Sequence, residues 1–230
     1  MIALLFLALA AFLLFRFLGG APRLRVRRHQ PVQVAAAKID ELTEYAHRLR
    51  VGNKYTSAEK VYLQILKIDH KHVSTYSRLG TLYSAQKKYG DAIECFQVAT
   101  QLSPSGSTFY NLGVAYYENK NPMKAIAALE KSIMFEPSLQ RYVALAKTFG
   151  KLGDSERMIG TLEQAVQFEP NSKVYWLLAD AYAAGGQPEQ QERVIEQLRE
   201  HDPKDARLKA EYPKRKPKAK KTPELEKTGS

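Results

Sequence analysis

Few side chains of this sequence are placed to perform covalent chemistry. Five histidines stand at positions 29, 47, 70, 72 and 201, and only His70 and His72 lie close together, next to Asp69. Imidazole and carboxylate groups bind transition metals, but a closed site needs more ligands on a rigid scaffold. No Ser or Cys nucleophile occurs in a recognisable motif with a paired base, and there is no phosphate-binding loop. We therefore expect no catalytic residue, no metal site and no cofactor.

The single cysteine, Cys95, cannot form an internal disulfide or a multi-cysteine metal site. It adjoins Phe96 in an expected helix, so we interpret it as a small hydrophobic residue of the core. A lone thiol also favours a reducing compartment.

The positive charge of the chain is concentrated at its two ends. The composition, 44% hydrophobic and 26% charged with a net charge of +11, is that of an ordinary folded protein. Residues 1–38 hold six basic residues and no acidic one, residues 39–204 hold 20 of each, and residues 205–230 hold nine basic and four acidic residues. A nucleic-acid groove along the folded body would need a basic face, so nucleic-acid binding there is not expected.

The first 18 residues are predicted to form a transmembrane anchor. A run of 14 apolar residues extends from Ile2 to Phe15, and two more follow Arg16. As a helix, residues 2–18 would span roughly 26 Å, slightly less than a hydrocarbon core of ~30 Å. Five arginines follow the start of this segment and none precedes it, so the positive-inside rule places the N-terminus outside and the remainder in the cytoplasm. Cleavage near Gly20 and export of the chain is the alternative.

Residues 19–38 are predicted to be a basic linker, because its glycines and prolines disfavour a helix. The arginines of this linker lie next to the expected membrane surface, where each can gain about 1 kcal/mol from anionic lipid. They are Arg23, Arg25, Arg27 and Arg28. A role as topology determinants alone is the alternative.

A repeat of 33 residues runs through the middle of the chain. Leucine recurs at positions 79, 112, 145 and 178, a small residue follows each leucine, and an aromatic residue stands at 83, 116, 149 and 182. Each unit ends on a proline, at 104, 137, 170 or 203. The spacings of three and four predict a first helix with one apolar face, and the proline predicts the end of a second helix. We expect Asp91 to be the N-cap of one such second helix.

This pattern resembles the tetratricopeptide repeat (TPR), W-x2-L-G-x2-Y…A-x3-F…P. One unit matches it with Tyr76, Leu79, Gly80, Tyr83, Ala92, Phe96 and Pro104, and the next with Phe109, Leu112, Gly113, Tyr116, Ala125, Leu129 and Pro137. The third full copy departs at Ala146 and Met158, the fourth at Ala179 and Gln191, and an earlier, weaker copy spans about 39–72.

The resemblance implies an all-α fold, a TPR solenoid that forms a right-handed superhelix. The five expected repeats are about 39–72, 73–105, 106–138, 139–171 and 172–204. Residues 205–230 are predicted to be a basic, disordered tail, in which Asp205 to Tyr212 could add one or two helical turns.

In proteins of the TPR family the first helices of the units line a concave groove that binds peptides or partner helices. The resemblance places Tyr110, Asn111, Val114, Tyr117, Lys147, Lys151, Trp176 and Asp180 in this groove. Asn111 lacks the partner lysine and asparagine of the family's carboxylate clamp, so binding of chaperone tails is disfavoured. For the aromatic residues, packing against the next repeat is the alternative.

The sequence thus predicts a membrane-anchored scaffold or adaptor, not an enzyme, that binds a protein or peptide partner through its concave groove and assists complex assembly at the membrane, with its TPR domain on the cytoplasmic side. An exported TPR protein of envelope or pilus assembly, and a nucleic-acid or ribosome tether acting through the basic tail, are the alternatives.

Overall fold

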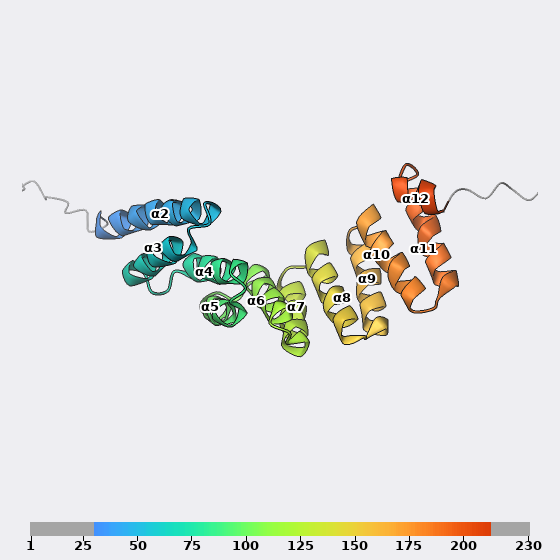
Figure 1. Ribbon diagram of the computed structural model, residues 1–230, viewed down its shortest axis with the longest axis horizontal. Helices are drawn as coiled ribbons and strands as arrows, with labels where there is room; N and C mark the ends of the chain where they lie inside the picture. Colours follow the sequence, from blue (N-terminus) through green and yellow to red (C-terminus); the bar gives the residue numbers. More distant parts are fainter. Residues whose placement is uncertain (1–29, 213–230) are drawn as a thin grey trace, which may run out of the picture.

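The computed structural model describes residues 30–212, and all regular structure in this range is α-helical (Figure 1). The helices are α2 (Gln30–Val51), α3 (Tyr55–Ile68), α4 (Val73–Ala85), α5 (Tyr89–Leu102), α6 (Gly106–Glu118), α7 (Pro122–Phe135), α8 (Leu139–Leu152), α9 (Ser155–Phe168), α10 (Ser172–Ala184), α11 (Pro188–His201) and α12 (Ala206–Glu211).

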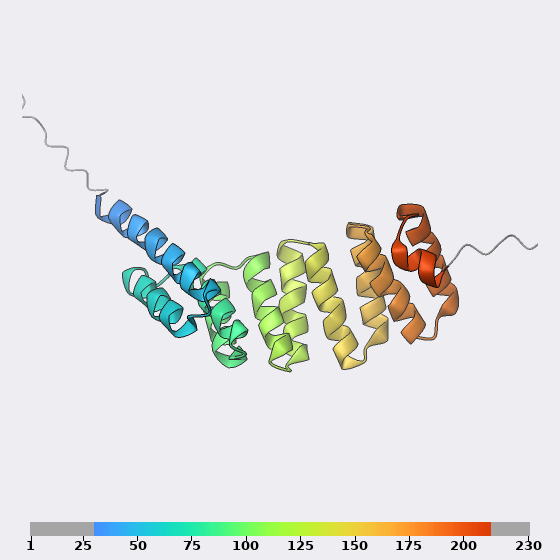
Figure 2. The same cartoon turned by 45° about the horizontal axis from the view of Figure 1, so that its top comes forward.

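The helices form five successive antiparallel pairs, and α12 follows the last pair. Figures 1 and 2 show the pairs stacked in chain order in an elongated array, with α2 at one end and α12 at the other. Each pair packs against the next, since the second helix of one unit contacts the first helix of the following unit. The predicted all-α solenoid of helix pairs is confirmed.

The predicted anchor, residues 1–18, lies outside the described residues, as do Arg23, Arg25, Arg27 and Arg28. Between residues 30 and 212, no helix combines the length and the apolar character that a membrane crossing requires. The anchor therefore stays a prediction.

One boundary differs from the sequence-based expectation. Helix α2 begins at Gln30, so residues 30–38 of the predicted linker are helical; Pro31 does not prevent this, because a proline in the first turn removes no intrahelical hydrogen bond. At the other end, α12 lies within Asp205 to Tyr212, where the sequence allowed one or two further helical turns. The Asp205 side chain accepts a hydrogen bond from the Leu208 amide (2.8 Å), and the Leu208 side chain is buried.

The turns within the pairs share one geometry. Asn53, Lys87, Lys120, Gly153 and Gly186 stand at equivalent places, and all have positive φ. In two units the residue directly after the positive-φ position is the N-cap of the second helix. The side chains of Asn121 and Asp154 accept hydrogen bonds from the amides of Lys124 and Arg157. The equivalent residue of the second unit is Lys88, so the expectation that Asp91 is the N-cap was wrong; Asp91 lies in the first turn.

The close approach of the two helices in a pair depends on the small residue that follows the recurring leucine of each unit. A Cβ atom added to Gly80 would lie 2.6 Å from the Phe96 ring, and one added to Gly113 would lie 2.7 Å from Leu129 Cγ and 3.3 Å from the Ala125 carbonyl oxygen. The glycines are therefore required for space. Because of this close contact, the second-helix side chain that faces the glycine is almost completely buried: Phe96 is 3% and Leu129 1% exposed.

Hydrogen bonds at three of the recurring aromatic positions tie a unit to the one before it. Tyr83 Oη donates to Glu59 (2.8 Å), Gln97 Nε2 donates to Tyr116 Oη (2.8 Å), and Tyr182 Oη donates to Glu163. Burial and the neighbouring Glu163 carboxylate raise the pKa of Tyr182 to about 12, so its hydroxyl stays a donor at neutral pH.

The departures of the last two units from the repeat pattern have local compensations. Met158 is larger than the usual alanine, and its sulfur lies 2.8 Å from the point where a Cβ of Gly150 would be. The polar Gln191 donates from Nε2 to the Tyr212 hydroxyl (2.9 Å), next to α12.

We predict that Gly113→Leu overpacks the α6–α7 contact and lowers the free energy of unfolding by about 1–3 kcal/mol or more. Thermal melting followed by circular dichroism measures the effect. The matched control is Gly160→Ala: a Cβ at Gly160 meets no atom within 4 Å, so this change should leave stability unchanged or raise it by about 0.5–1 kcal/mol. A Gly113→Leu protein as stable as the wild type would contradict the packing.

Candidate functional site

The first helices of the central units line one face of the solenoid. Helix α4 contacts α6 and α6 contacts α8, whereas the second helices of neighbouring units make few contacts with one another. The face formed by the first helices is therefore the inner, concave one.

A hollow of about 910 Å³ opens on this concave face between α6, α8 and the start of α10. Its lining combines two tyrosine rings, Tyr110 and Tyr117, with the aliphatic side chains of Val114 and Val143 and the ammonium group of Lys147. These rings and aliphatic chains are half-buried, and Lys147 is exposed. The site offers apolar surface in its depth and a positive charge at its edge.

Four of the eight residues predicted for the groove thus line one hollow: Tyr110, Val114, Tyr117 and Lys147. Lys151 lies beside it, with Nζ 4.7 Å from the centre of the Tyr117 ring, where the cation faces the π system. Asn111 is half-buried on α6 and does not line the hollow.

The other two predicted residues, Trp176 and Asp180, lie next to α12; the Trp176 side chain is buried and the Asp180 side chain stays exposed. Trp176 is 8% exposed; its Nε1 donates to Asp205 (3.3 Å), and its ring lies 6.0 Å from that of Tyr212. The Arg207 guanidinium lies 4.2 Å from the Trp176 ring centre.

Asp180 is held by the same arginine. Arg207 donates to both carboxylate oxygens of Asp180 (2.8 and 3.1 Å) and also to Glu211 (3.0 Å). These carboxylates raise the pKa of Arg207 above its usual value. Trp176 thus packs against α12, whereas Asp180 remains exposed beside it.

The structure adds residues that the sequence reasoning missed. Gln140 and Lys173 line the hollow, and Gln140 Nε2 donates to the Tyr110 hydroxyl (2.9 Å). Gln140 stands three residues before Val143, and Lys173 stands three residues before Trp176. Helical residues three apart lie on the same face, so the spacing in the sequence could have indicated both. Glu118 and Glu169 also line the hollow and bring its charge close to balance.

Comparison with known proteins identifies the repeat. Family models described as tetratricopeptide repeat match residues 77–137 and residues 139–172. The resemblance inferred from the sequence is confirmed over these residues. No curated protein sequence matches the chain.

Several solved structures share the fold. The MamA protein is 22% identical with a TM-score of 0.65, and the match covers 77% of this chain and 96% of MamA. MamA of Desulfovibrio magneticus RS-1 is 16% identical with a TM-score of 0.63, covering 74% and 98% of the two chains. YrrB, described as a TPR protein with an unusual peptide-binding site, is 17% identical with a TM-score of 0.57, covering 71% and 86%. At these identities the similarity is one of fold.

We predict that Trp176→Ala destabilises the protein, because it removes the surface on which α12 packs; truncation of a buried aromatic costs about 3 kcal/mol or more. Tyr117→Ala, at a half-buried position in the hollow, should cost clearly less. Urea unfolding of the two variants measures the difference. Equal losses of stability, or a loss confined to Tyr117→Ala, would contradict the position of α12.

Proposed function

We propose that this chain, whose residues 77–137 and 139–172 are tetratricopeptide repeats, is a scaffold that holds a protein or peptide partner in its concave groove beside a membrane. The observation that carries the proposal is the hollow between α6, α8 and α10, where Tyr110, Tyr117 and Val143 surround an opening edged by Lys147. Aromatic side chains supply much contact area at a small entropic cost, and they often dominate binding energy.

The form of the site favours a peptide or a partner helix over a small molecule. The hollow extends across units from α6 to the start of α10, and its lining includes both apolar and charged groups. Such a surface suits an amphipathic segment that buries apolar side chains against the rings and exposes its polar face. The fold shared with YrrB, a peptide-binding TPR protein by its description, supports the same class of ligand.

The membrane part of the proposal rests on the sequence alone. The apolar run from Ile2 to Phe15 and the arginines after it favour a single-pass anchor with the repeats on the cytoplasmic side. A scaffold in that position would gather its partner at the membrane surface and assist assembly there.

We predict that Tyr117→Ala and Lys147→Glu each reduce partner capture about tenfold or more while the helical content stays unchanged. Affinity capture with the full chain, quantified by mass spectrometry, measures the loss. Lys60→Glu, an exposed charge reversal on α3 away from the hollow, is the matched control and should capture the same proteins as the wild type. Capture that survives both groove variants would refute the groove as the binding site.

The membrane orientation has its own prediction. In a Cys95→Ala background, the cysteine of Ser230→Cys should resist a membrane-impermeant maleimide in intact cells and react after permeabilisation. Removal of Cys95 keeps the assay clean, although burial and nearby acidic groups raise the pKa of this thiol to about 11 and so slow its reaction. Labelling of intact cells would exclude a cytoplasmic repeat domain.

A further inference from the structure

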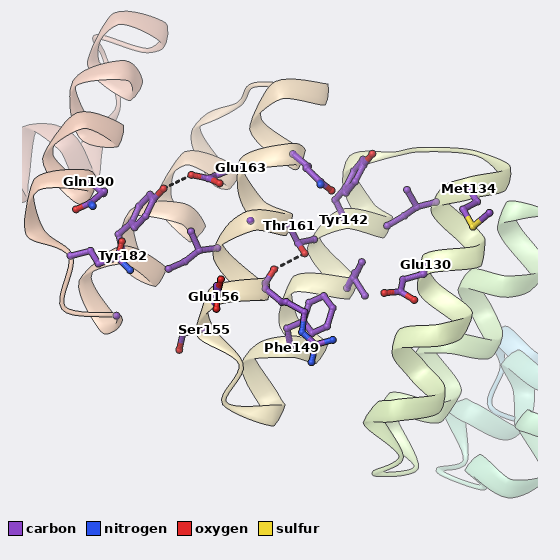
Figure 3. A pocket seen from close by; sticks show the side chains of 18 residues that line it. Glu130, Met134, Tyr142, Phe149, Ser155, Glu156, Thr161, Glu163, Tyr182 and Gln190 are labelled. Atoms are coloured by element: carbon purple, nitrogen blue, oxygen red, sulfur yellow. Dashed lines mark hydrogen bonds between the residues drawn. The ribbon is translucent and has the colours of Figure 1, made fainter.

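A second hollow, of about 1040 Å³, lies on the face formed by the second helices. Figure 3 shows it over α9, with Glu130 and Met134 of α7 on one side and Tyr182 and Gln190 on the other. Its floor comes from α8 and α10. Since its rim belongs to the second helices, this hollow opens on the face opposite to the concave groove.

Two features of the fourth unit leave space at this hollow. A Cβ at Gly160, in the middle of α9, would meet no atom within 4 Å. Phe149 stands where Tyr116 and Tyr182 stand in other units, and it has no hydroxyl to bond with Glu130, which stands where Gln97 and Glu163 stand. The fourth unit therefore has open space beside Gly160 and a Glu130 carboxylate without a tyrosine hydroxyl at the position equivalent to Tyr116 and Tyr182.

The lining contains three acidic and three aromatic residues. Glu130, Glu156 and Glu163 contribute carboxylates, and all three are exposed. The one basic residue of the lining, Arg157, is paired with Asp154 (2.5 Å) and lies over the Phe149 ring. The rings of Tyr142, Phe149 and Tyr182 provide apolar faces between the carboxylates.

This combination suits a basic, proline-containing segment. Prolines pack on aromatic rings in peptide-binding grooves, and lysine or arginine side chains pair with carboxylates or lie over rings. The chain contains such a segment: residues 213–221 carry Lys214, Arg215, Lys216, Lys218, Lys220 and Lys221 with two prolines and no acidic residue.

We propose that this hollow binds the chain's own segment Pro213–Lys221. The contact is intramolecular, it is independent of what the concave groove binds, and it places the basic charge of the C-terminus on the outer face of the fourth and fifth units. Exposed ion pairs are individually weak, so attachment to the same chain is what makes the contact populated, by raising the effective concentration of the segment.

The starting point of the segment is within reach of the hollow. The Tyr212 carbonyl oxygen accepts a hydrogen bond from Arg199 of α11 (3.1 Å), and Gln190 of the same helix lines the hollow. Nine helical residues separate Arg199 from Gln190, a rise of about 13 Å, and a helix is about 10–12 Å across. An extended segment of nine residues spans about 30 Å, more than the length of α11 from Arg199 to Gln190 and the width of a helix together.

The test measures how accessible the segment is in the full-length protein. Trypsin cleaves after lysine and arginine, so docking of Pro213–Lys221 should slow its cleavage at low salt, and high salt should restore the rate by screening. The double variant Glu130→Gln with Glu156→Gln should raise the low-salt cleavage rate about 3- to 10-fold, the change expected when two exposed ion pairs are lost. Glu163 is kept because it bonds with Tyr182.

Two matched controls separate docking from general charge and from folding. Glu189→Gln with Glu192→Gln removes two exposed charges of α11 that lie outside the hollow and should leave the rate unchanged. Gly160→Arg, which fills the hollow with a cation, should accelerate cleavage as the double variant does, whereas Gly160→Ala should not. Equal effects of hollow and control variants, or no effect of either, would overturn the proposal.

Carbodiimide crosslinking identifies the occupant directly. Crosslinks from Lys214–Lys221 to Glu130, Glu156 or Glu163 within a monomer are the expected result. Crosslinks mainly to other carboxylates would overturn the site, and crosslinks confined to dimers would overturn the intramolecular contact in favour of a second copy of the chain.

Discussion

The close contact between the two helices of each unit is the constraint on which the rest of the structure depends. At Gly80 and Gly113 the facing side chain occupies the space of a Cβ atom, and that side chain is Phe96 or Leu129, a buried apolar residue of the second helix. A helix pair closed in this way still exposes apolar surface on both sides, so it is stable only when another unit covers it. The row of units, and hence the groove that crosses them, follows from that requirement.

The same positions carry different residues in different units, and those differences decide what each face can bind. Tyr116 and Tyr182 use their hydroxyl groups to hold the preceding second helix, whereas Phe149 cannot. With Gly160 in α9, this loss leaves the outer face of the fourth unit open and acidic. A regular scaffold thus acquires a specific surface through a few departures from its repeat.

The sequence predicted the helix pairs well because a period of 33 repeats the same packing several times, so errors at single positions do not shift the register. Four of the eight residues that the sequence assigned to the groove line the concave hollow. Three of these four, Tyr110, Val114 and Tyr117, share one face of α6. The contact between Trp176 and α12 was not predicted, because nothing in the spacing shows that a six-residue helix beyond Pro203 brings Arg207 onto that ring. The outer hollow was not predicted, since it arises from absent atoms rather than from a motif.

Helix α8 contributes to both hollows, and this gives the two faces a physical connection. Val143 and Lys147 point to the concave groove, while Tyr142, Leu145 and Phe149 line the outer hollow. Protein interiors are close-packed, so a helix between two surfaces moves as a body and does not absorb a shift on one side alone. The concave groove and the outer hollow therefore share one helix, although different side chains of α8 line each of them.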